Sequence, residues 1–367
     1  MQFVINRDAL LKPLQMVSGA IERRHTLPIL SNVLLEVTEH ELALTGTDLE
    51  VELVATTEAV QVQQVGRITV PAKKLLDICR SLPENSDIKV VLQSESCILT
   101  CGKTKFTLST LSAAEYPNLE SWQGEVDISL SRQQLRKLLD DTAFSMANQD
   151  VRYYLNGLLF EVDNGSLTAV GTDGHRLALS KLSLPNVNVQ QKQIIIPRKG
   201  VLEIMRLLAN DDQVIQLSLG QNHIRLSDQG FTFSSKLIDG RFPDYRRVLP
   251  RNSTKLVTAH RPVLKDACTR ASILSNEKYR GVRFTLNNGE IQIMANNPEH
   301  EQAEEVIEVE YAGDMLEIGF NVGYMLDVLN TLNTDLVILH LNDANSSTLI
   351  EGVGNEGASY VVMPMRL

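Results

Sequence analysis

The sequence repeats one pattern three times, with a period of about 125 residues. A turn-like segment recurs at offsets of 125 and 124 residues: Gly46-Thr47-Asp48-Leu49-Glu50, Gly171-Thr172-Asp173-Gly174-His175 and, more weakly, Ala295-Asn296-Asn297-Pro298-Glu299. A second landmark begins at Val70, Ile196 and Phe320, and a looser third one at Tyr116, Phe242 and Met363. Three landmarks in register predict three copies of one structural domain, at residues 1–125, 126–252 and 253–367.

Each copy carries the same order of helix and strand signals. An amphipathic helix is predicted near the start of each copy, around residues 10–17, 131–146 and 262–272, because apolar residues recur there every three or four positions. A second helix is predicted directly after the second landmark, and alternating segments such as 33–37 and 158–162 read as strands. With 43% hydrophobic residues to build cores, the pattern predicts three similar α+β domains.

Bulk composition excludes several classes of protein. Four cysteines without close pairing do not make a disulfide framework, which favours a reducing cytoplasm. The N-terminus lacks the pattern of a signal peptide, and no segment is long and apolar enough to cross a bilayer, so we expect no membrane partner. A net charge of −10 argues mildly against polyanionic partners, although a large chain can segregate its charges.

A linear array of three such domains would expose an unpaired strand edge at each end, which natural proteins avoid. The sequence shows no distinct capping segments. Pairing the front end of one chain with the back end of another removes both edges and closes a ring of six domains. With sheets outside and twelve helices inside, the bore would be about 28 Å, which admits a nucleic acid duplex. We therefore predict a head-to-tail homodimer.

The two ends of the chain carry complementary features. Two lysines precede a phenylalanine in the first copy, five glutamates lie within residues 299–308 in the third, and two apolar residues end a predicted helix there. An acidic stretch is more often a solvated face, but this placement suits the head-to-tail contact. The predicted interface residues are Lys103, Lys105, Phe106, Leu108, Ile273, Leu274, Glu301, Glu304 and Glu305.

Basic residues concentrate on the predicted helices of a chain that is acidic overall. Each one alone reads as part of a solvated helix face, but together they favour a positive lining that binds phosphates without reading bases. The loop at 148–154 mixes amides, an arginine and two tyrosines, which can touch a DNA backbone or stack on bases. One buried and one exposed tyrosine at the start of a strand would give the same pattern.

Signatures of catalysis and of metal binding are incomplete. Gly102-Lys103-Thr104 lacks the first glycine of a phosphate-binding loop, and two nearby cysteines lack further ligands for zinc. Asp173 and His175 could form the acid–base pair of a hydrolase. However, Asp48 occupies the same turn without a histidine, so we predict that the aspartate is a turn residue. We expect no catalytic residue, metal or cofactor. A peptide-binding scaffold that does not touch nucleic acid is the other alternative.

Four segments carry a resemblance to a known family: TLPIL at 26–30, GTDGHRL at 171–177, DGRFPDYRRV at 239–248 and VVMPMRL at 361–367. The whole chain closely resembles the bacterial β sliding clamp family, the processivity subunits of replicative DNA polymerase III. The resemblance implies the DNA clamp fold and a ring-shaped homodimer without catalytic activity. It also implies a clamp loader, polymerase subunits and repair proteins as partners, recognised through short linear motifs.

The same resemblance implies two sets of binding residues, carried over by position. The contacts to duplex DNA, made without sequence preference, would be Arg24, Lys73, Lys74, Gln149, Tyr153 and Tyr154. The pocket for partner peptides would be formed by Leu155, Thr172, Gly174, His175, Arg176, Leu177, Pro243, Arg247, Val248, Asn321, Tyr324, Met363, Pro364, Met365 and Arg366. The C-terminal segment could instead be a final edge strand packed on its own core and ended by Pro364.

Overall fold

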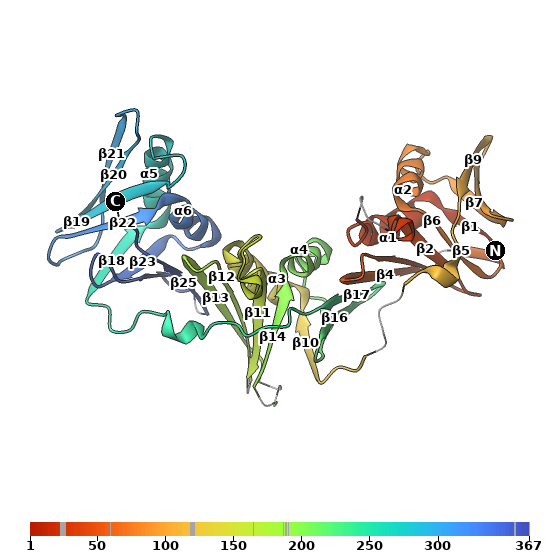
Figure 1. The fold of residues 1–367 in the computed structure, drawn as a ribbon, viewed down its shortest axis with the longest axis horizontal. Coiled ribbons are helices and arrows are strands. Elements are labelled where there is room, and N and C mark those ends of the chain that lie inside the picture. Colours follow the sequence, from red (N-terminus) through yellow and green to blue (C-terminus); the bar gives the residue numbers. More distant parts are fainter. Residues whose placement is uncertain are drawn as a thin grey trace. The chain divides into compact units, whose positions relative to one another are not determined.

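The computed structural model describes residues 1–22, 27–58, 60–117, 122–163, 165–185, 187, 189, 191–355 and 357–366. The chain divides into two compact units, one of residues 1–133 and 202–237 and the other of residues 134–201 and 238–367. Each unit holds two sheets with helices packed against them (Figure 1). Every pairing between named strands in the described residues is antiparallel, which suits short connections between neighbouring strands.

Unit 1 contains a five-stranded and an eight-stranded sheet. Its strands are β1 (Gln2–Asn6), β2 (Asn32–Val37), β3 (Leu42–Thr47), β4 (Val51–Thr57), β5 (Val60–Gln64), β6 (Gly66–Pro71), β7 (Asp87–Gln93), β8 (Ser96–Cys101), β9 (Thr104–Ser109), β10 (Val126–Ser131), β15 (Val214–Leu219), β16 (His223–Asp228) and β17 (Phe231–Lys236). Its helices are α1 (Arg7–Val17), α2 (Ala72–Ser81) and the second half of α4 (Arg198–Leu207). The sheet orders are β5-β1-β7-β8-β9 and β10-β15-β16-β17-β4-β3-β2-β6.

Unit 2 contains an eight-stranded and a four-stranded sheet. Its strands are β11 (Gly157–Asp163), β12 (Ser166–Thr172), β13 (Arg176–Ser183), β14 (Lys192–Pro197), β18 (Lys255–His260), β19 (Gly281–Asn287), β20 (Glu290–Asn296), β21 (Gln302–Glu308), β22 (Leu316–Asn321), β23 (Leu336–Leu341), β24 (Thr348–Gly352) and β25 (Ala358–Val362). Its helices are most of α3 (Arg132–Thr142), α5 (Arg261–Ile273) and α6 (Val322–Thr331). The sheet orders are β14-β11-β12-β13-β25-β24-β23-β18 and β21-β20-β19-β22.

The two predicted helices are present in every copy of the repeat. Helices α1, α3 and α5 take the first position, and α2, α4 and α6 begin directly after the second landmark. In α1, Leu10, Leu14 and Val17 are buried, as the amphipathic pattern predicts, whereas Leu11 is only partly buried. Local periodicity was therefore sufficient to find these helices.

The recurring turn has the same hydrogen bonds in the first two copies. Oδ1 of Asp48 accepts two backbone N–H groups, at 2.9 and 2.8 Å, and Oδ1 of Asp173 accepts the two corresponding ones at 2.9 and 3.0 Å. In the third copy, Oδ1 of Asn297 accepts the backbone N–H of Glu301 at 2.9 Å. The prediction that this aspartate is a structural turn residue is confirmed, since its carboxylate serves the backbone.

Strand pairing joins neighbouring copies in the same way twice. The last strand of the second copy, β17, pairs with β4 of the first, and the last strand of the third copy, β25, pairs with β13 of the second. By position in the repeat, β4, β13 and β21 are equivalent, and so are β9, β17 and β25. Among the described strands, β9 and β21 each lie at the edge of a sheet and have one neighbour. They are the open ends that the sequence predicted for a linear array.

The arginine that begins the first helix of each copy makes structural contacts. Nε of Arg7 and Nε of Arg261 donate to backbone carbonyls in or after the second helix of the same copy, at 2.7 and 2.6 Å. Arg132 forms a two-pronged ion pair with Asp228, at 2.6 and 2.8 Å, and the Asp228 side chain is 1% exposed. These three guanidinium groups therefore stabilise the fold, and the predicted positive lining rests on the other basic residues of the helices.

Candidate functional site

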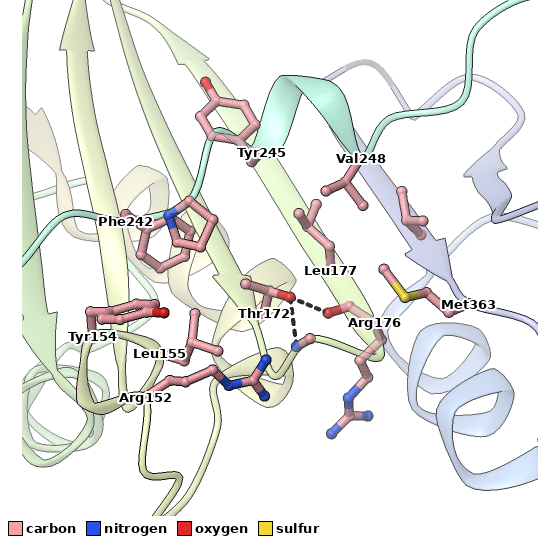
Figure 2. Close-up of a pocket in the computed structure, with 13 residues that line it drawn as sticks. Arg152, Tyr154, Leu155, Thr172, Arg176, Leu177, Phe242, Tyr245, Val248 and Met363 are labelled. Carbon is pink, nitrogen blue, oxygen red and sulfur yellow. Dashed lines mark hydrogen bonds between the residues drawn. The ribbon is translucent and has the colours of Figure 1, made fainter.

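Unit 2 contains a hollow of about 200 Å³ where four segments meet (Figure 2). These segments are the 3-10 helix Tyr153–Leu155, the turn between β12 and β13, the segment 242–248, and the end of β25. The lining residues are Arg152, Tyr154, Leu155, Thr172, Gly174, Arg176, Leu177, Phe242, Pro243, Tyr245, Val248, Val361 and Met363. We call this the first hollow.

Three buried aliphatic side chains form its apolar base. Leu177 of β13 pairs directly with Val361 of β25, so the two side chains lie on the same face of the sheet. Leu155 comes from the 3-10 helix, and none of the three is more than 2% exposed. Because β13 and β25 are interior strands of one sheet, their hydrogen-bonded register fixes the base of the hollow before any ligand arrives.

The turn between β12 and β13 places a glycine close to Arg152. The Thr172 hydroxyl donates to the carbonyl oxygen of Arg176 at 2.6 Å and accepts the N–H of Gly174 at 3.1 Å (Figure 2). Gly174 has φ +88°, and a Cβ there would lie 2.7 Å from Nη1 of Arg152. A side chain at this position would strain the backbone and displace the arginine from the rim.

Arg152 is held at the rim by charge-assisted hydrogen bonds. Its guanidinium donates to both carboxylate oxygens of Asp150, at 3.0 and 2.8 Å, and to the carbonyl oxygen of Asp173 at 3.0 Å. These bonds lower the pKa of Asp150 to about 2, mainly through the side-chain hydrogen bond from Arg152. The carboxylate therefore stays ionised near neutral pH and keeps Arg152 in place.

Glu161 of β11 supports the segment that forms one wall of the first hollow. Its side chain is 3% exposed, accepts a hydrogen bond from the Tyr245 hydroxyl at 3.1 Å, and is also hydrogen-bonded to Arg246 and Gln193. Burial raises the pKa of Glu161, but the hydrogen bonds from Arg246, Gln193 and Tyr245 outweigh it and hold the pKa below its usual value. Burial also raises the pKa of Tyr245 to about 12, so its hydroxyl stays protonated as a donor.

Arg176 occupies the opposite rim. Nε of Arg176 donates to Asp173 at 3.1 Å, Nη2 donates to the Phe144 carbonyl oxygen at 3.0 Å, and Nη1 pairs with Asp327. Its guanidinium lies 4.6 Å from the ring centre of Tyr324, close enough for a cation–π contact. The side chain is 12% exposed, so Arg176 is a fixed part of the rim.

The structure brings together part of the residue set that the resemblance implied for a peptide pocket. The predicted residues that line the first hollow are Leu155, Thr172, Gly174, Arg176, Leu177, Pro243, Val248 and Met363. His175 and Tyr324 stack beside it with ring centres 6.3 Å apart, and Asn321 caps α6 through its side chain. Arg247 is largely exposed and pairs with Asp244 at 3.1 Å. Met365 and Arg366 line a second hollow, whereas Pro364 lines neither.

Five lining residues were missed from the sequence: Arg152, Tyr154, Phe242, Tyr245 and Val361. The sequence assigned Tyr154 to DNA contact; its side chain is partly buried and lines the first hollow, and the DNA contact stays a prediction. Phe242 and Tyr245 flank a proline in one of the family-like segments, and such an aromatic pair was a usable signal. Val361 gave no local signal, because its position depends on pairing with Leu177.

The sequence allowed the C-terminal segment to be either part of a peptide pocket or a final edge strand, and the structure combines features of both. β25 lies between β13 and β24 and is fully buried at Val361 and Val362, so it is an interior strand, which corrects the edge-strand alternative. Beyond it, the N–H of Met363 donates to the His175 carbonyl oxygen at 2.9 Å, and the Met363 side chain lines the first hollow. The chain therefore belongs to the hydrophobic core up to Val362, and Met363 beyond it belongs to the rim of the first hollow.

Of the residues predicted to contact DNA, those that the structure describes are exposed, except for the partly buried Tyr154. Lys73 and Lys74 are exposed on α2 in unit 1. In unit 2, Gln149 is exposed with φ +57°, and Tyr153 is 56% exposed. Arg24 lies outside the described residues.

The predicted interface residues gather on the two edge strands and on α5. Ile273 is 74% exposed and Leu274 and Phe106 are partly buried, whereas Leu108 is only 6% exposed. Little of the Leu108 side chain is exposed in the single chain, and its place in the interface stays a prediction. Each predicted glutamate already has a partner in its own chain; Glu305, for example, pairs with Arg270 at 2.7 Å.

Within the described ranges, no group of three or more His, Cys, Asp and Glu side chains is arranged to hold a metal ion. No helix in the same ranges combines the length and apolar content needed to cross a membrane. The four cysteines are free thiols, and burial raises the pKa of Cys79 and Cys268 to about 12 and that of Cys97 to about 11.

Comparison with known proteins identifies the family. Residues 1–120, 129–244 and 246–366 match the N-terminal, central and C-terminal domains of the DNA polymerase III beta subunit. The chain belongs to the beta sliding clamp family. The beta sliding clamps of Pseudomonas putida and Escherichia coli K12 are 53% and 51% identical to it over 367 residues, covering both chains completely.

Solved structures show the same fold. The crystal structure of the DNA polymerase III subunit beta from Pseudomonas aeruginosa has 53% identity and a TM-score of 0.98, with full coverage of both chains. A sliding clamp from the same organism bound to griselimycin has 53% identity and a TM-score of 0.97, also with full coverage. The chain therefore has the three-domain DNA clamp fold. The family is a processivity factor rather than a catalyst, which excludes the hydrolase alternative.

The Glu161→Gln substitution should loosen the wall formed by residues 245–248. Because the pKa of Glu161 is lowered, its stabilising effect is present above the ordinary glutamate pKa of about 4.3 and is lost as pH falls through the lowered value. Losing one charged hydrogen-bond acceptor costs about 2 kcal/mol, so amide hydrogen exchange at Val248 should quicken roughly thirty-fold at pH 7 and much less at a pH below the lowered pKa of Glu161. Glu290→Gln, at an exposed position of the same unit, is the control. Equal acceleration at both pH values would contradict this role of the ionised carboxylate.

Proposed function

We propose that this protein encircles duplex DNA as a head-to-tail homodimer and tethers DNA polymerases to it. The observation that carries the proposal is the preformed apolar hollow with two fixed arginines at its rim, in a chain of the beta sliding clamp family. Such a hollow suits a short peptide with an apolar end, because an apolar anchor in a desolvated pocket supplies most of the binding free energy. The tether would thus join any partner that carries the peptide, such as polymerase subunits, the clamp loader and repair proteins.

The repeat itself supports the dimer contact. β17 pairs with β4, and β25 pairs with β13, each time joining the last strand of one copy to the third strand after the first helix of the preceding copy. By the same rule, the open edge of β9 in one chain would pair with the open edge of β21 in a second chain. Two such contacts would close the dimer and leave no open edge at either strand.

The register of this contact can be inferred from the two internal ones. Phe233 lies opposite Leu53 in the first, and Tyr360 lies opposite Ala178 in the second. The hairpin registers of β9 and β21 make Phe106 equivalent to Phe233 and Ala303 equivalent to Leu53. Phe106 of one chain would therefore face Ala303 of the other, and Lys105 would face Glu304. Ile273 is exposed at the end of α5, which packs on β21, and would join the same contact.

The DNA contacts would be electrostatic and indifferent to sequence. Lys73 and Lys74 offer exposed charge on α2, and Gln149 and Tyr153 offer exposed polar and aromatic groups. None of these forms the bidentate arrangement that reads bases, so the affinity would come from phosphates and fall steeply with salt. We include Arg24 and Tyr154 in this set by their positions in the sequence.

We also propose three domains with boundaries at 1–125, 126–252 and 253–367, and action in the cytoplasm. The family domains match residues 1–120, 129–244 and 246–366, and the internal repeat has the same period. Four free thiols are compatible with a reducing compartment.

Retention on DNA tests the proposed function directly. Loaded onto nicked circular duplex DNA by a clamp loader, the protein should remain bound at high salt and be released once a nuclease linearises the circle. Encirclement predicts this dependence on topology, since a ring can leave linear DNA only at its ends. Equal retention on linear and circular DNA, or marked preference for one sequence, would contradict the proposal.

Charge reversal tests the dimer register. Lys105→Glu or Glu304→Lys should place like charges opposite each other at both contacts and raise the dimer dissociation constant roughly ten-fold, whereas the double variant should regain most of the loss. Sedimentation equilibrium measures this, with Lys89→Glu on β7, two strands away from β9 in the same sheet, as the control. A double variant as weak as the singles would show that Lys105 and Glu304 do not face each other.

Changes at the C-terminus test the first hollow. Met363→Ala should weaken binding of a peptide with a Gln near its start and Leu or Phe near its end by about ten-fold, and deletion of residues 363–367 should abolish it. The dimer should survive both changes, because the core ends at Val362. Fluorescence anisotropy measures the affinity, and Met315→Ala, at an exposed methionine of unit 2, is the control. Full affinity after the deletion would place the peptide site elsewhere.

A further inference from the structure

Unit 2 has a second hollow, of about 430 Å³. It lies on the four-stranded sheet β21-β20-β19-β22, and Figure 1 shows the C-terminus of the chain beside this sheet. Its lining combines two arginines with two methionines, a tyrosine and two asparagines. The lining residues are Asn276, Tyr279, Gly281, Arg283, Met294, Asn296, Met365 and Arg366.

The strand register places the second hollow on the solvent-facing side of the sheet. Arg283 of β19 pairs with Met294 of β20, so their side chains project from the same face. Val282 and Phe284, the neighbours of Arg283 in sequence, are buried in the core on the opposite face. The base of the hollow is therefore part of a rigid ladder.

The C-terminal segment and a loop supply the walls. The N–H of Met365 donates to the Gly319 carbonyl oxygen at 2.9 Å, and Gly319 of β22 pairs with Arg283. This bond holds the C-terminal segment beside the arginine. On the other side, Oδ1 of Asn276 accepts the N–H of Tyr279 at 2.9 Å and shapes a loop whose tyrosine is 57% exposed.

The charges of the second hollow favour an anionic ligand. Arg283 and Arg366 are both exposed, and neither forms an ion pair with another residue in the described part of the chain. The nearby Met294, Met365 and Tyr279 offer apolar surface beside them. A ligand that combines a carboxylate with a short apolar stem suits this lining, because arginine binds carboxylates in a two-pronged geometry.

The two hollows are connected by the C-terminal segment. Met363 lines the first, and Met365 and Arg366 line the second, so at about 3.3 Å per residue of extended chain Met363 is about 7 Å from Met365 and about 10 Å from Arg366. A partner peptide that runs along this segment would reach the second hollow with three or four residues beyond the part held in the first. We propose that the second hollow binds acidic residues that precede the apolar end of a partner peptide. This inference rests on the proposed role of the first hollow.

Three synthetic peptides test the proposal: a short peptide for the first hollow, the same peptide extended at its N-terminus by three glutamates, and one extended by three lysines. The glutamate extension should raise affinity for the wild-type protein by about three- to ten-fold, and the gain should fall at high salt. Arg283→Gln should remove most of this gain and leave affinity for the short peptide unchanged. Arg80→Gln, at an exposed arginine of unit 1, should change neither.

A charge swap keeps the test independent of folding defects. Arg283→Glu should bind the lysine extension more tightly than the glutamate extension, which a merely damaged protein would not do. An equal gain from glutamates in wild type and Arg283→Gln would overturn the proposal. The proposal would also be overturned if Arg283→Gln bound duplex DNA more weakly than the wild type while the glutamate extension gave no gain in peptide affinity. The second hollow would then bind phosphates. If the short peptide itself fails to bind the wild type, the proposed role of the first hollow is wrong instead.

Discussion

Antiparallel pairing between copies of the repeat is the constraint on which the rest of the structure depends. The pairing of β13 with β25 sets Val361 beside Leu177 and so creates the base of the first hollow. A slip of one residue would turn these side chains to the other face of the sheet and remove it. The same rule leaves β9 and β21 without a second neighbour, and an unpaired edge is a template for another chain. The same rule of strand pairing thus accounts for both the first hollow and the proposed dimer contact.

Charge in this protein is used first to hold the fold. Arg132 forms an ion pair with the nearly buried Asp228, and Glu161 forms one with Arg246. Arg176 pairs with both Asp173 and Asp327. A count of basic residues on helices therefore overestimates the charge available to DNA. What stays exposed, such as Lys73 and Lys74, suits weak contacts that allow sliding.

The C-terminal segment connects fold and recognition. Up to Val362 it is an interior strand, and beyond Val362 it contributes methionines to two hollows on the same unit. Methionine is unbranched and adapts to differently shaped partners, which suits a site shared by several proteins. Rigid strands supply the bases of both hollows, and the flexible side chains lie at their walls.

The sequence by itself determined the three-fold repeat, its helices and its turn aspartates. Leu10 and Leu14 reveal a helix face, and Asp48 and Asp173 reveal a turn, because both signals lie within a few residues of one another. Only the tertiary structure decided that Tyr154 and Tyr245 line the first hollow, that β25 is interior, and that Arg283 meets Met365. These contacts join segments far apart in the chain, and they arise from packing and strand register, which leave no periodic trace in the sequence around any one of the residues.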